Sequence, residues 1–400
     1  MRGVTAAPEP ATRPGAAKTP LPPVFRALWL GTLVNRLATF VAPFLMLYLV
    51  RDRGVAPVTA SALLTVQGAG LALSNVAGGW LADRVGRRGT MIAGLATTAG
   101  IMALLPSAGP LWTVAVLVAA LGLTADLHRP ALNAFVADVV APDERARAYS
   151  MLHWATNLGL TAALAGGGLI AEASYAWLFR LDAATTLGFA LVVWWLVPRD
   201  GHDRRPPPGD PAQGRSPWRD PRLLAFSVIT FLVFLVFFQN FVTLPLAVTD
   251  LGLTAADFGL VLAVNGVAVA ILQPLTAARL KRFRPGTALA AGYLLIGAGY
   301  GLVAFATDVP ALAGTVLVWG LGEIVVVAVG TAYVASLVPA HTRGRYLGVY
   351  GAAMAAAVAA APLAGTLAYD VHPDALWFGC AAVGVLTAAW QLRLGRAPAR

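Results

Sequence analysis

Cysteine, acidic residues and charge in general are scarce in this 400-residue chain. The single cysteine, Cys380, excludes a disulfide within the chain and any metal cluster built on several thiolates. Charged residues make up only 12% of the sequence, about half the usual share of a soluble globule. Hydrophobic residues make up 58%, and the mean hydropathy is +0.71. This composition predicts a protein that crosses the membrane many times.

Several catalytic and targeting signals are also missing. The first 25 residues hold no apolar core of the length that a signal peptide needs, and their composition predicts a disordered cytoplasmic tail. No G-x-x-x-x-G-K-[ST] loop and no H-E-x-x-H motif occurs. The histidines at 153, 202, 341 and 372 lack metal-ligand spacing. We therefore expect no enzyme activity, no cofactor and no metal site.

Twelve apolar segments are long enough to span a bilayer as helices, which takes about 20 residues each. They lie at 26–50, 57–81, 88–107, 111–138, 145–171, 176–197, 222–248, 255–278, 287–306, 311–337, 343–369 and 374–394. Between the sixth and the seventh lies a stretch rich in proline and charge, 198–221, which predicts a cytoplasmic linker.

The basic residues support this layout. With both termini placed inside the cell, the cytoplasmic segments hold all but five of the 29 Lys and Arg residues. The exceptions are Arg51, Arg53 and Arg180 at the outer ends and Arg36 and Arg129 within helices. This asymmetry follows the positive-inside rule and predicts cytoplasmic termini. In a soluble chain, the net charge of +10 would suggest a nucleic-acid partner. Here the basic residues indicate which loops are cytoplasmic, and we expect no nucleic-acid partner.

The most informative stretch is the loop from Gly78 to Gly89, where an apolar run stops abruptly at Asp83 before three arginines. Its signature residues are Gly79, Asp83, Arg84, Gly86, Arg87 and Arg88. Their spacing resembles the loop between helices 2 and 3 of the major facilitator superfamily, G-x-L-a-D-r-x-G-r-[kr]. The resemblance implies two six-helix halves, a cavity lined by helices 1, 4, 7 and 10, and solute transport by alternating access.

An internal repeat agrees with two related halves. Residues match at an offset of 198, as in the pairs Gly54 and Gly252, Gly122 and Gly320, and Arg145 and Arg343. The halves therefore read as parallel repeats. We expect an all-α membrane protein with six-helix bundles at 26–197 and 222–394, joined by the linker at 198–221, with tails at 1–25 and 395–400.

By the same resemblance, the signature loop latches the first half onto helix 11 while the cytoplasmic side is closed. Asp83 would then meet the N-terminus of helix 11, where free backbone N–H groups and the charge of Arg343 attract an anion. The alternative is that Asp83 only neutralises Arg84 or Arg87 nearby.

Four charged residues lie deep within the predicted helices: Arg36, Asp126, Arg129 and Glu323. A charge at the bilayer centre costs at least ~2.5–3.5 kcal/mol, so each must pair or face a water-filled cavity. Asp126 and Arg129 share one helix face. They form a self-neutralising pair, or Asp126 exchanges between Arg129 and Arg36. Pro130 follows directly and predicts a bend in helix 4.

Glu323 has no basic residue within one helical turn on its own segment. Apolar surroundings favour the protonated form of a carboxyl group, which suits a group that must bind and release a proton. Glu323 is thus our candidate for proton coupling. The alternative is a neutral acid that hydrogen-bonds to a neighbouring helix.

Helix 7 carries phenylalanines 231, 234, 238 and 241 on one helical stripe. The stripe either packs within the protein or faces the cavity, where it would suit a lipophilic or cationic solute. We place Asn35, Phe234, Phe238, Gln239, Phe241 and Trp319 in the predicted substrate cavity.

The end of helix 4 and helix 5 resemble the twelve-helix multidrug:proton antiporters of the superfamily. Gly159 and the glycines at 166–168 match parts of the helix-5 signature g-x-x-x-G-P-x-x-G-G, although Ala163 and Leu164 replace its Gly-Pro, and Val118 stands where helix 4 usually has arginine. The resemblance implies proton-coupled export of a lipophilic small molecule, such as a drug or a secondary metabolite.

We expect a plasma-membrane monomer whose partners are the solute, protons and the bilayer. One alternative is proton-coupled uptake of a nutrient on the same fold. Another is a transporter-like sensor or scaffold, which would not need the costly buried charges.

Overall fold

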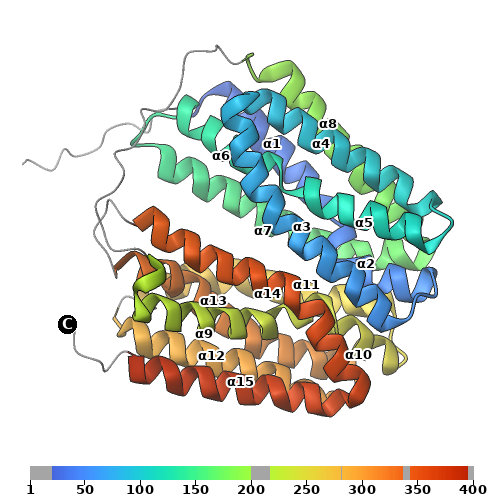
Figure 1. The fold of residues 1–400 in the computed structure, drawn as a ribbon, viewed down its shortest axis with the longest axis vertical. Coiled ribbons are helices and arrows are strands. Elements are labelled where there is room, and N and C mark those ends of the chain that lie inside the picture. The colour runs from blue at the N-terminus through green and yellow to red at the C-terminus, as the bar shows by residue number, and fades with distance from the viewer. Residues whose placement is uncertain (1–19, 200–216, 281, 337–342, 395–400) are drawn as a thin grey trace, which may run out of the picture.

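The computed structural model describes residues 20–199, 217–280, 282–336 and 343–394 (Figure 1). Within these ranges the chain is helical and forms no β-strand. The first half comprises α1 (Pro23–Leu37), α2 (Val41–Leu47), a π-helical turn (Tyr48–Asp52), α3 (Pro57–Arg84), α4 (Arg87–Leu104), α5 (Leu111–Ala125), α6 (His128–Val139), α7 (Arg145–Ala173) and α8 (Tyr175–Leu196).

The second half comprises α9 (Pro221–Phe237), the 3-10 turn η4 (Phe238–Phe241), α10 (Leu244–Asp250), α11 (Ala255–Leu280), α12 (Pro285–Leu302), α13 (Val309–Ser336), α14 (Arg343–Val371) and α15 (Pro373–Leu394). Short 3-10 turns at Leu105–Ser107, Pro217–Arg219 and Val303–Phe305 complete the described elements.

Eleven of the described helical segments are long and apolar enough to cross a membrane. The remaining long helix, α7, has 29 residues but is less apolar, because polar residues such as His153 and Asn157 interrupt its run. Together they confirm the predicted twelve-helix membrane fold, and each predicted segment ends within three residues of the observed one.

Three spans are interrupted, whereas the sequence predicts a bend in the fourth span alone. The first breaks after Leu37, the fourth at Asp126, and the seventh passes through η4. In the fourth span the break precedes Pro130, which lies in the first turn of α6. A proline there removes no hydrogen bond, since the first N–H groups of a helix have no partner within it.

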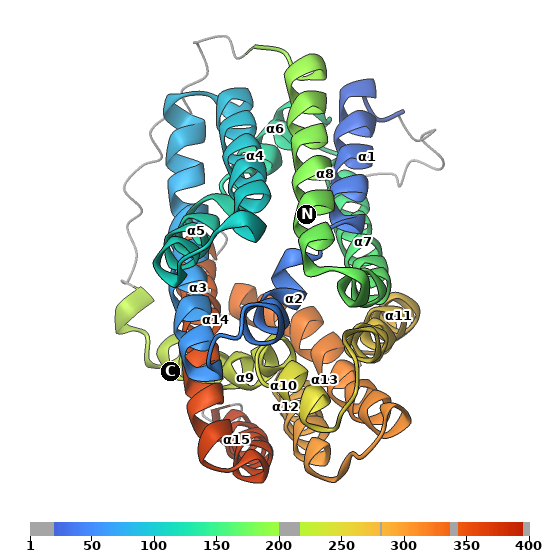
Figure 2. The same ribbon diagram turned by 90° about the vertical axis from the view of Figure 1, so that its right-hand side faces the viewer.

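The elements of each half lie together in space. Figures 1 and 2 show α1–α8 in one group and α9–α15 in the other. The main contacts between the groups run from α3 to α14 and from α7 to α11. We call the end with the α3–α4 and α6–α7 loops the basic end. The ribbons of the two groups diverge toward it (Figure 1).

The two contacts between the halves obey the repeat. Gly68 on α3 faces Ala359 on α14, and Gly266 on α11 faces Thr161 on α7. Each member of one pair lies 198 residues from its counterpart in the other. A Cβ at Gly68 would lie 2.9 Å from the Cα of Ala359, and a Cβ at Gly266 would overlap the Thr161 side chain. Both crossings thus require glycine, as close helix contacts in membranes commonly do.

Further hydrogen bonds join the two halves between these crossings and the end of the molecule opposite the basic end. Ser61 bonds Thr366, and Thr65 Oγ1 accepts from Leu363 N at 3.3 Å. The latter N–H follows Pro362, which interrupts the hydrogen bonding of α14. The halves are therefore held together from the middle of the molecule to the end opposite the basic end.

Candidate functional site: a cavity between the halves

A cavity lies beside the α7–α11 crossing. Its lining comes from α7, η4, α11 and α13 and consists of Asn157, Leu160, Thr161, Leu164, Asn240, Phe241, Leu262, Asn265, Gly266, Val269, Trp319 and Glu323. Both halves contribute to this lining. Most of the surface is apolar, with a few polar groups among it, the usual character of a small-molecule site.

Glu323 is the ionisable group of this cavity. Its carboxylate accepts a hydrogen bond from Asn265 Nδ2, with 2.9 Å between Nδ2 and Oε2. No basic residue forms an ion pair with it among the described residues. The acid thus depends on a neutral amide from the neighbouring helix, an arrangement compatible with either protonation state.

The close approach of α11 and α13 makes this hydrogen bond possible. Asn265 Oδ1 lies where a Cβ on Gly320 would stand, so a larger residue at that position would displace the amide. In the first half the equivalent glycine, Gly122, faces the backbone of Gln67, the residue that lies 198 positions before Asn265. Both halves therefore contain this close helix crossing. In the second half, the side chain that lies at the crossing also binds the acid Glu323.

An aromatic cluster supports one wall. Trp319 is fully buried, stacks on Tyr300 at 5.6 Å between ring centroids and meets Phe237 edge to face at 5.6 Å. The hydroxyl of Tyr300 donates to the Phe237 carbonyl at 2.6 Å. These contacts fix the indole beside Glu323, one helical turn away on α13.

The structure brings three of the predicted site residues together, since Phe241, Trp319 and Glu323 all line the cavity. Other predicted cavity residues lie elsewhere. Gln239 is 2% exposed and bonds the carbonyl of Ala361 on α14 at 3.2 Å and the hydroxyl of Thr243 at 3.0 Å. Phe234 and Phe238 pack with one another at 6.1 Å between ring centroids.

Asn35, also placed in the predicted cavity, lies in the first half. Its Nδ2 donates a hydrogen bond to Thr186 Oγ1 on α8 at 2.8 Å. The Thr186 hydroxyl in turn donates to the Asp182 carboxylate at 3.4 Å. Asp182 Oδ2 also accepts from the Val41 backbone N–H at 3.2 Å, and so holds the start of α2 after the break in the first span.

Sequence reasoning missed Asp182 as a fifth charge within the spans and missed the cavity amides Asn157, Asn240 and Asn265. The available signal was the same for all four: a polar residue within an apolar span, which at membrane depth needs a partner or a water-filled surface.

Three of the four predicted network charges, Arg36, Asp126 and Arg129, lie in the first half and outside the cavity lining, apart from Glu323. Arg129 Nη1 lies 3.1 Å from Asp126 Oδ2, and Asn75 on α3 donates to the same oxygen at 3.4 Å. Arg36 is near enough to Asp126, Arg129 and Asp182 for their charges to act on it. The self-neutralising pair is therefore present, with Arg36 as a third charge close by.

The arginines of the signature loop have separate partners. Arg87 forms an ion pair with Asp138 at 2.6 Å, Arg84 stacks on Trp80, and Arg88 stacks on Trp194. Gly86 has a φ of +94°, a conformation that L side chains rarely adopt.

Asp83 is exposed and has no ion pair or hydrogen bond with any described residue. The alternative in which Asp83 forms a local ion pair with Arg84 or Arg87 is thus not observed in this conformation. The side chain of Arg343, the other part of the predicted latch, lies outside the described residues, and Gly79 has open space around it.

Known proteins resemble this chain over nearly its whole length. The family model of the Major Facilitator Superfamily matches residues 28–248 and again 226–400. "Multidrug resistance protein MdtH" of Yersinia pestis is 26% identical over 80% of this chain and 82% of that protein. The "Uncharacterized MFS-type transporter YqjV" of Bacillus subtilis is 23% identical over 82% of each chain.

Solved structures share the fold at lower identity. The "POT family transporter PepTSo" superposes with a TM-score of 0.79 at 15% identity, covering 94% of this chain and 98% of that one. A mutant of the "nucleoside transporter NupG" gives 0.72 at 11% identity, covering 93% and 98%. The family match, the relatives and the two-group helical fold agree: this chain belongs to the Major Facilitator Superfamily of transporters.

Proposed function

We propose that this transporter exports a lipophilic small molecule in exchange for protons by alternating access. The observation that supports this most directly is the cavity between the halves, in which Glu323 stands among apolar and aromatic side chains. A buried acid without a basic partner can gain and lose a proton, while the apolar walls suit a lipophilic solute.

The relatives support export of drug-like compounds over uptake. The name "multidrug resistance protein" belongs to relatives that match about four-fifths of this chain at 25–26% identity. The peptide and nucleoside transporters among the solved structures support the fold alone at their low identity.

The orientation follows from the charge distribution of the sequence. If the basic end faces the cytoplasm of the cell, the described conformation has its halves joined on the extracellular side. It would then be the cytoplasm-facing state, ready to take up solute from inside. In this state a latch formed by Asp83 and the start of α14 would be open, in keeping with the unpaired Asp83.

Everted membrane vesicles test direction and coupling together. When a proton pump acidifies their interior, an antiporter should accumulate a fluorescent lipophilic dye inside, whereas a proton symporter should deplete it. Glu323→Gln keeps the shape of the side chain but holds no exchangeable carboxyl proton, so gradient-driven accumulation should be lost.

The matched control is Glu144→Gln. Glu144 lies in the loop before α7, pairs with Arg147 at 3.3 Å and is remote from the cavity lining. Accumulation at the wild-type rate in Glu323→Gln would contradict the coupling role. Depletion of the dye from vesicles with the wild-type protein would indicate proton-coupled uptake and contradict the proposed export.

A further inference from the structure

The cavity lining contains two buried amide oxygens that accept no hydrogen bond from a described residue, Asn265 Oδ1 and Asn240 Oδ1. Asn240 in η4 is 3% exposed, and its Oδ1 is buried without a hydrogen-bond partner among the described residues. Native proteins satisfy such buried amide oxygens with a protein group, water or a ligand, because leaving them unpaired costs free energy. Asn240 therefore marks a place where a donor is expected.

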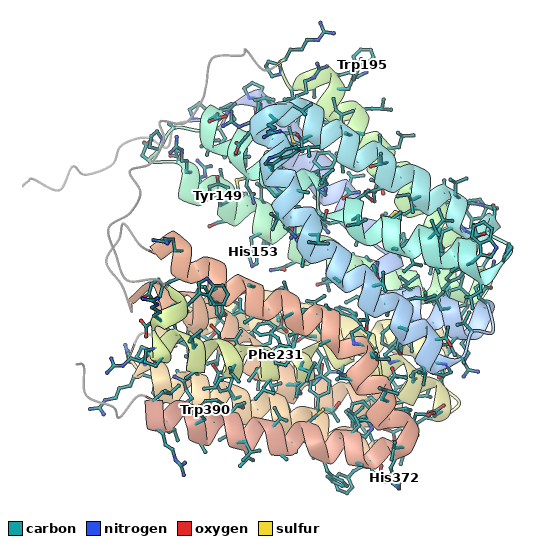
Figure 3. All side chains as sticks on the ribbon, viewed as in Figure 1. Tyr149, His153, Trp195, Phe231, His372 and Trp390 are labelled. Atoms are coloured by element: carbon teal, nitrogen blue, oxygen red, sulfur yellow. The ribbon has the colours of Figure 1, made fainter. Side chains whose placement is uncertain are left out.

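Three side chains of the neighbouring lining already direct a donor to a protein partner. Asn265 Nδ2 donates to Glu323, the Thr161 hydroxyl donates to its own helix at Asn157 O at 2.8 Å, and Asn157 Nδ2 meets His153 Nε2 at 3.0 Å. Figure 3 shows His153 on α7, toward the side where the halves diverge. Among the described lining side chains, the indole N–H of Trp319 is a buried donor without a partner.

Several acceptors of the lining are therefore not fully used, among them Asn265 Oδ1. A carboxylate has about four acceptor positions, and Glu323 receives one described bond, while Asn240 Oδ1 receives none. The rest of the lining is mainly apolar and includes Leu160, Leu262 and Phe241. This distribution fits a ligand whose polar head supplies donors and whose body is apolar.

We propose that the cavity binds an amphiphilic amine that keeps at least two N–H donors, one for the Glu323 carboxylate and one for Asn240 Oδ1. Primary and secondary ammonium groups meet this requirement. A tertiary ammonium has a single N–H, and a quaternary ammonium has none. This inference rests on the proposed function, because it names the ligand class of the same cavity.

A series of amines with constant charge tests it. The probes are 2-(1-naphthyl)ethylamine and its N-methyl, N,N-dimethyl and N,N,N-trimethyl derivatives, all of which are cations at pH 7. Calorimetry on the purified full-length chain should show the first two binding at least about tenfold more tightly than the trimethyl compound, because each hydrogen bond to a buried or charged acceptor is worth that much. The dimethyl compound should fall between them.

Asn240→Leu removes the acceptor at similar volume, and Asn240→Ala removes it with a smaller side chain. Both should bring the primary, secondary and tertiary amines within about threefold of one another, since the second bond is gone. Asn133→Leu is the control: Asn133 is an exposed residue of α6 outside the cavity lining, and it should leave the wild-type ranking intact.

Three results would overturn the proposal: equal affinities across the series in the wild type, a ranking that persists in both Asn240 variants, or no binding of any probe. The proposed export function is judged separately. If the ranking holds but acidified everted vesicles with the protein accumulate no more of the amines than vesicles without it, the ligand class stands and proton-driven export fails. If the protein increases the accumulation of all four probes equally over vesicles without it, export stands and the ligand class fails.

Discussion

Gly68→Ala tests whether the α3–α14 crossing keeps the end opposite the basic end shut. An added Cβ would lie 2.9 Å from both the Cα of Ala359 and the carbonyl oxygen of Val358. Both atoms belong to backbone that cannot rotate away, and relaxed contacts between such atoms need about 3.5–4 Å. The two helices must therefore separate by roughly 0.5–1 Å at the crossing.

Overpacking of this kind costs about 1–3 kcal/mol. Separation also lengthens the nearby bond from Leu363 N to Thr65 Oγ1, which is already 3.3 Å. This free energy destabilises the conformation in which the two helices are in contact. A conformation in which they have separated is not destabilised. The equilibrium should shift by about 5- to 150-fold toward opening at that end, the ratio that corresponds to this range of free energy.

Labelling of a single cysteine measures the shift. Leu160 lines the cavity, so Leu160→Cys in a Cys380→Ser background reports access to it. A membrane-impermeant maleimide is applied from the side opposite the basic loops, where only the minor, opened state admits it. The labelling rate should rise by the same factor in Gly68→Ala.

Gly100→Ala is the matched control, because Gly100 is a helical glycine with nothing within 4 Å of an added Cβ. Its labelling rate should equal that of the parent. An unchanged rate in Gly68→Ala, or an equal rise in Gly100→Ala, would refute the reasoning that this crossing forms the seal.

Three further predictions concern the charged residues. Arg36→Ala and Asp126→Ala should each slow transport, and because their charges interact, the double variant should lose less than the sum of the two in log rate; strict additivity would mean that they do not interact. Asp83→Asn should keep solute binding but lose turnover, since a helix N-terminus stabilises an anion by about 0.3–1 kcal/mol and the latch would close less often; full turnover would rule the latch out. Asp182→Leu should lower the free energy of unfolding by about 1–3 kcal/mol in thermal melts of the purified protein, because it leaves a buried N–H at the start of α2 without a partner, whereas Thr185→Ala should change little.

The spans and their pairing into halves could be predicted from the sequence because bilayer thickness and loop charge act on whole segments. A run of about 20 apolar residues signals a span whatever its neighbours are. The glycines at 54 and 252, matched by the repeat, have φ of +62° and +75° in equivalent loops. Such features are local, so a single sequence contains them.

The breaks within spans depend on tertiary contacts and were not predictable in the same way. Proline is the usual sequence signal for a bend, yet Pro130 lies just after the break in the fourth span. The first span breaks where Asp182, more than 140 residues away in the chain, supplies an acceptor for the Val41 N–H. Nothing near Val41 in sequence indicates that partner.

The cavity residues of the seventh span show how one such break misleads a helical pattern. The phenylalanine stripe assumes 100° per residue throughout, but Phe238–Phe241 form a 3-10 turn, which advances about 120° per residue. Over this turn the side chains rotate away from the expected faces. Gln239 then turns toward α14, while Asn240 and Phe241 line the cavity.

The repeat also explains why the acid of the cavity occurs in one half only. Gln67 and Asn265 are equivalent residues, but Gly122 meets the backbone of Gln67, whereas Gly320 meets the side-chain amide of Asn265. The position equivalent to Glu323 is Ala125, and the neighbouring Asp126 pairs with Arg129 instead. A backbone contact without an acid beside it has no proton to stabilise or release. The same crossing is therefore a packing contact in the first half, and in the second half it can respond to the charge of the site.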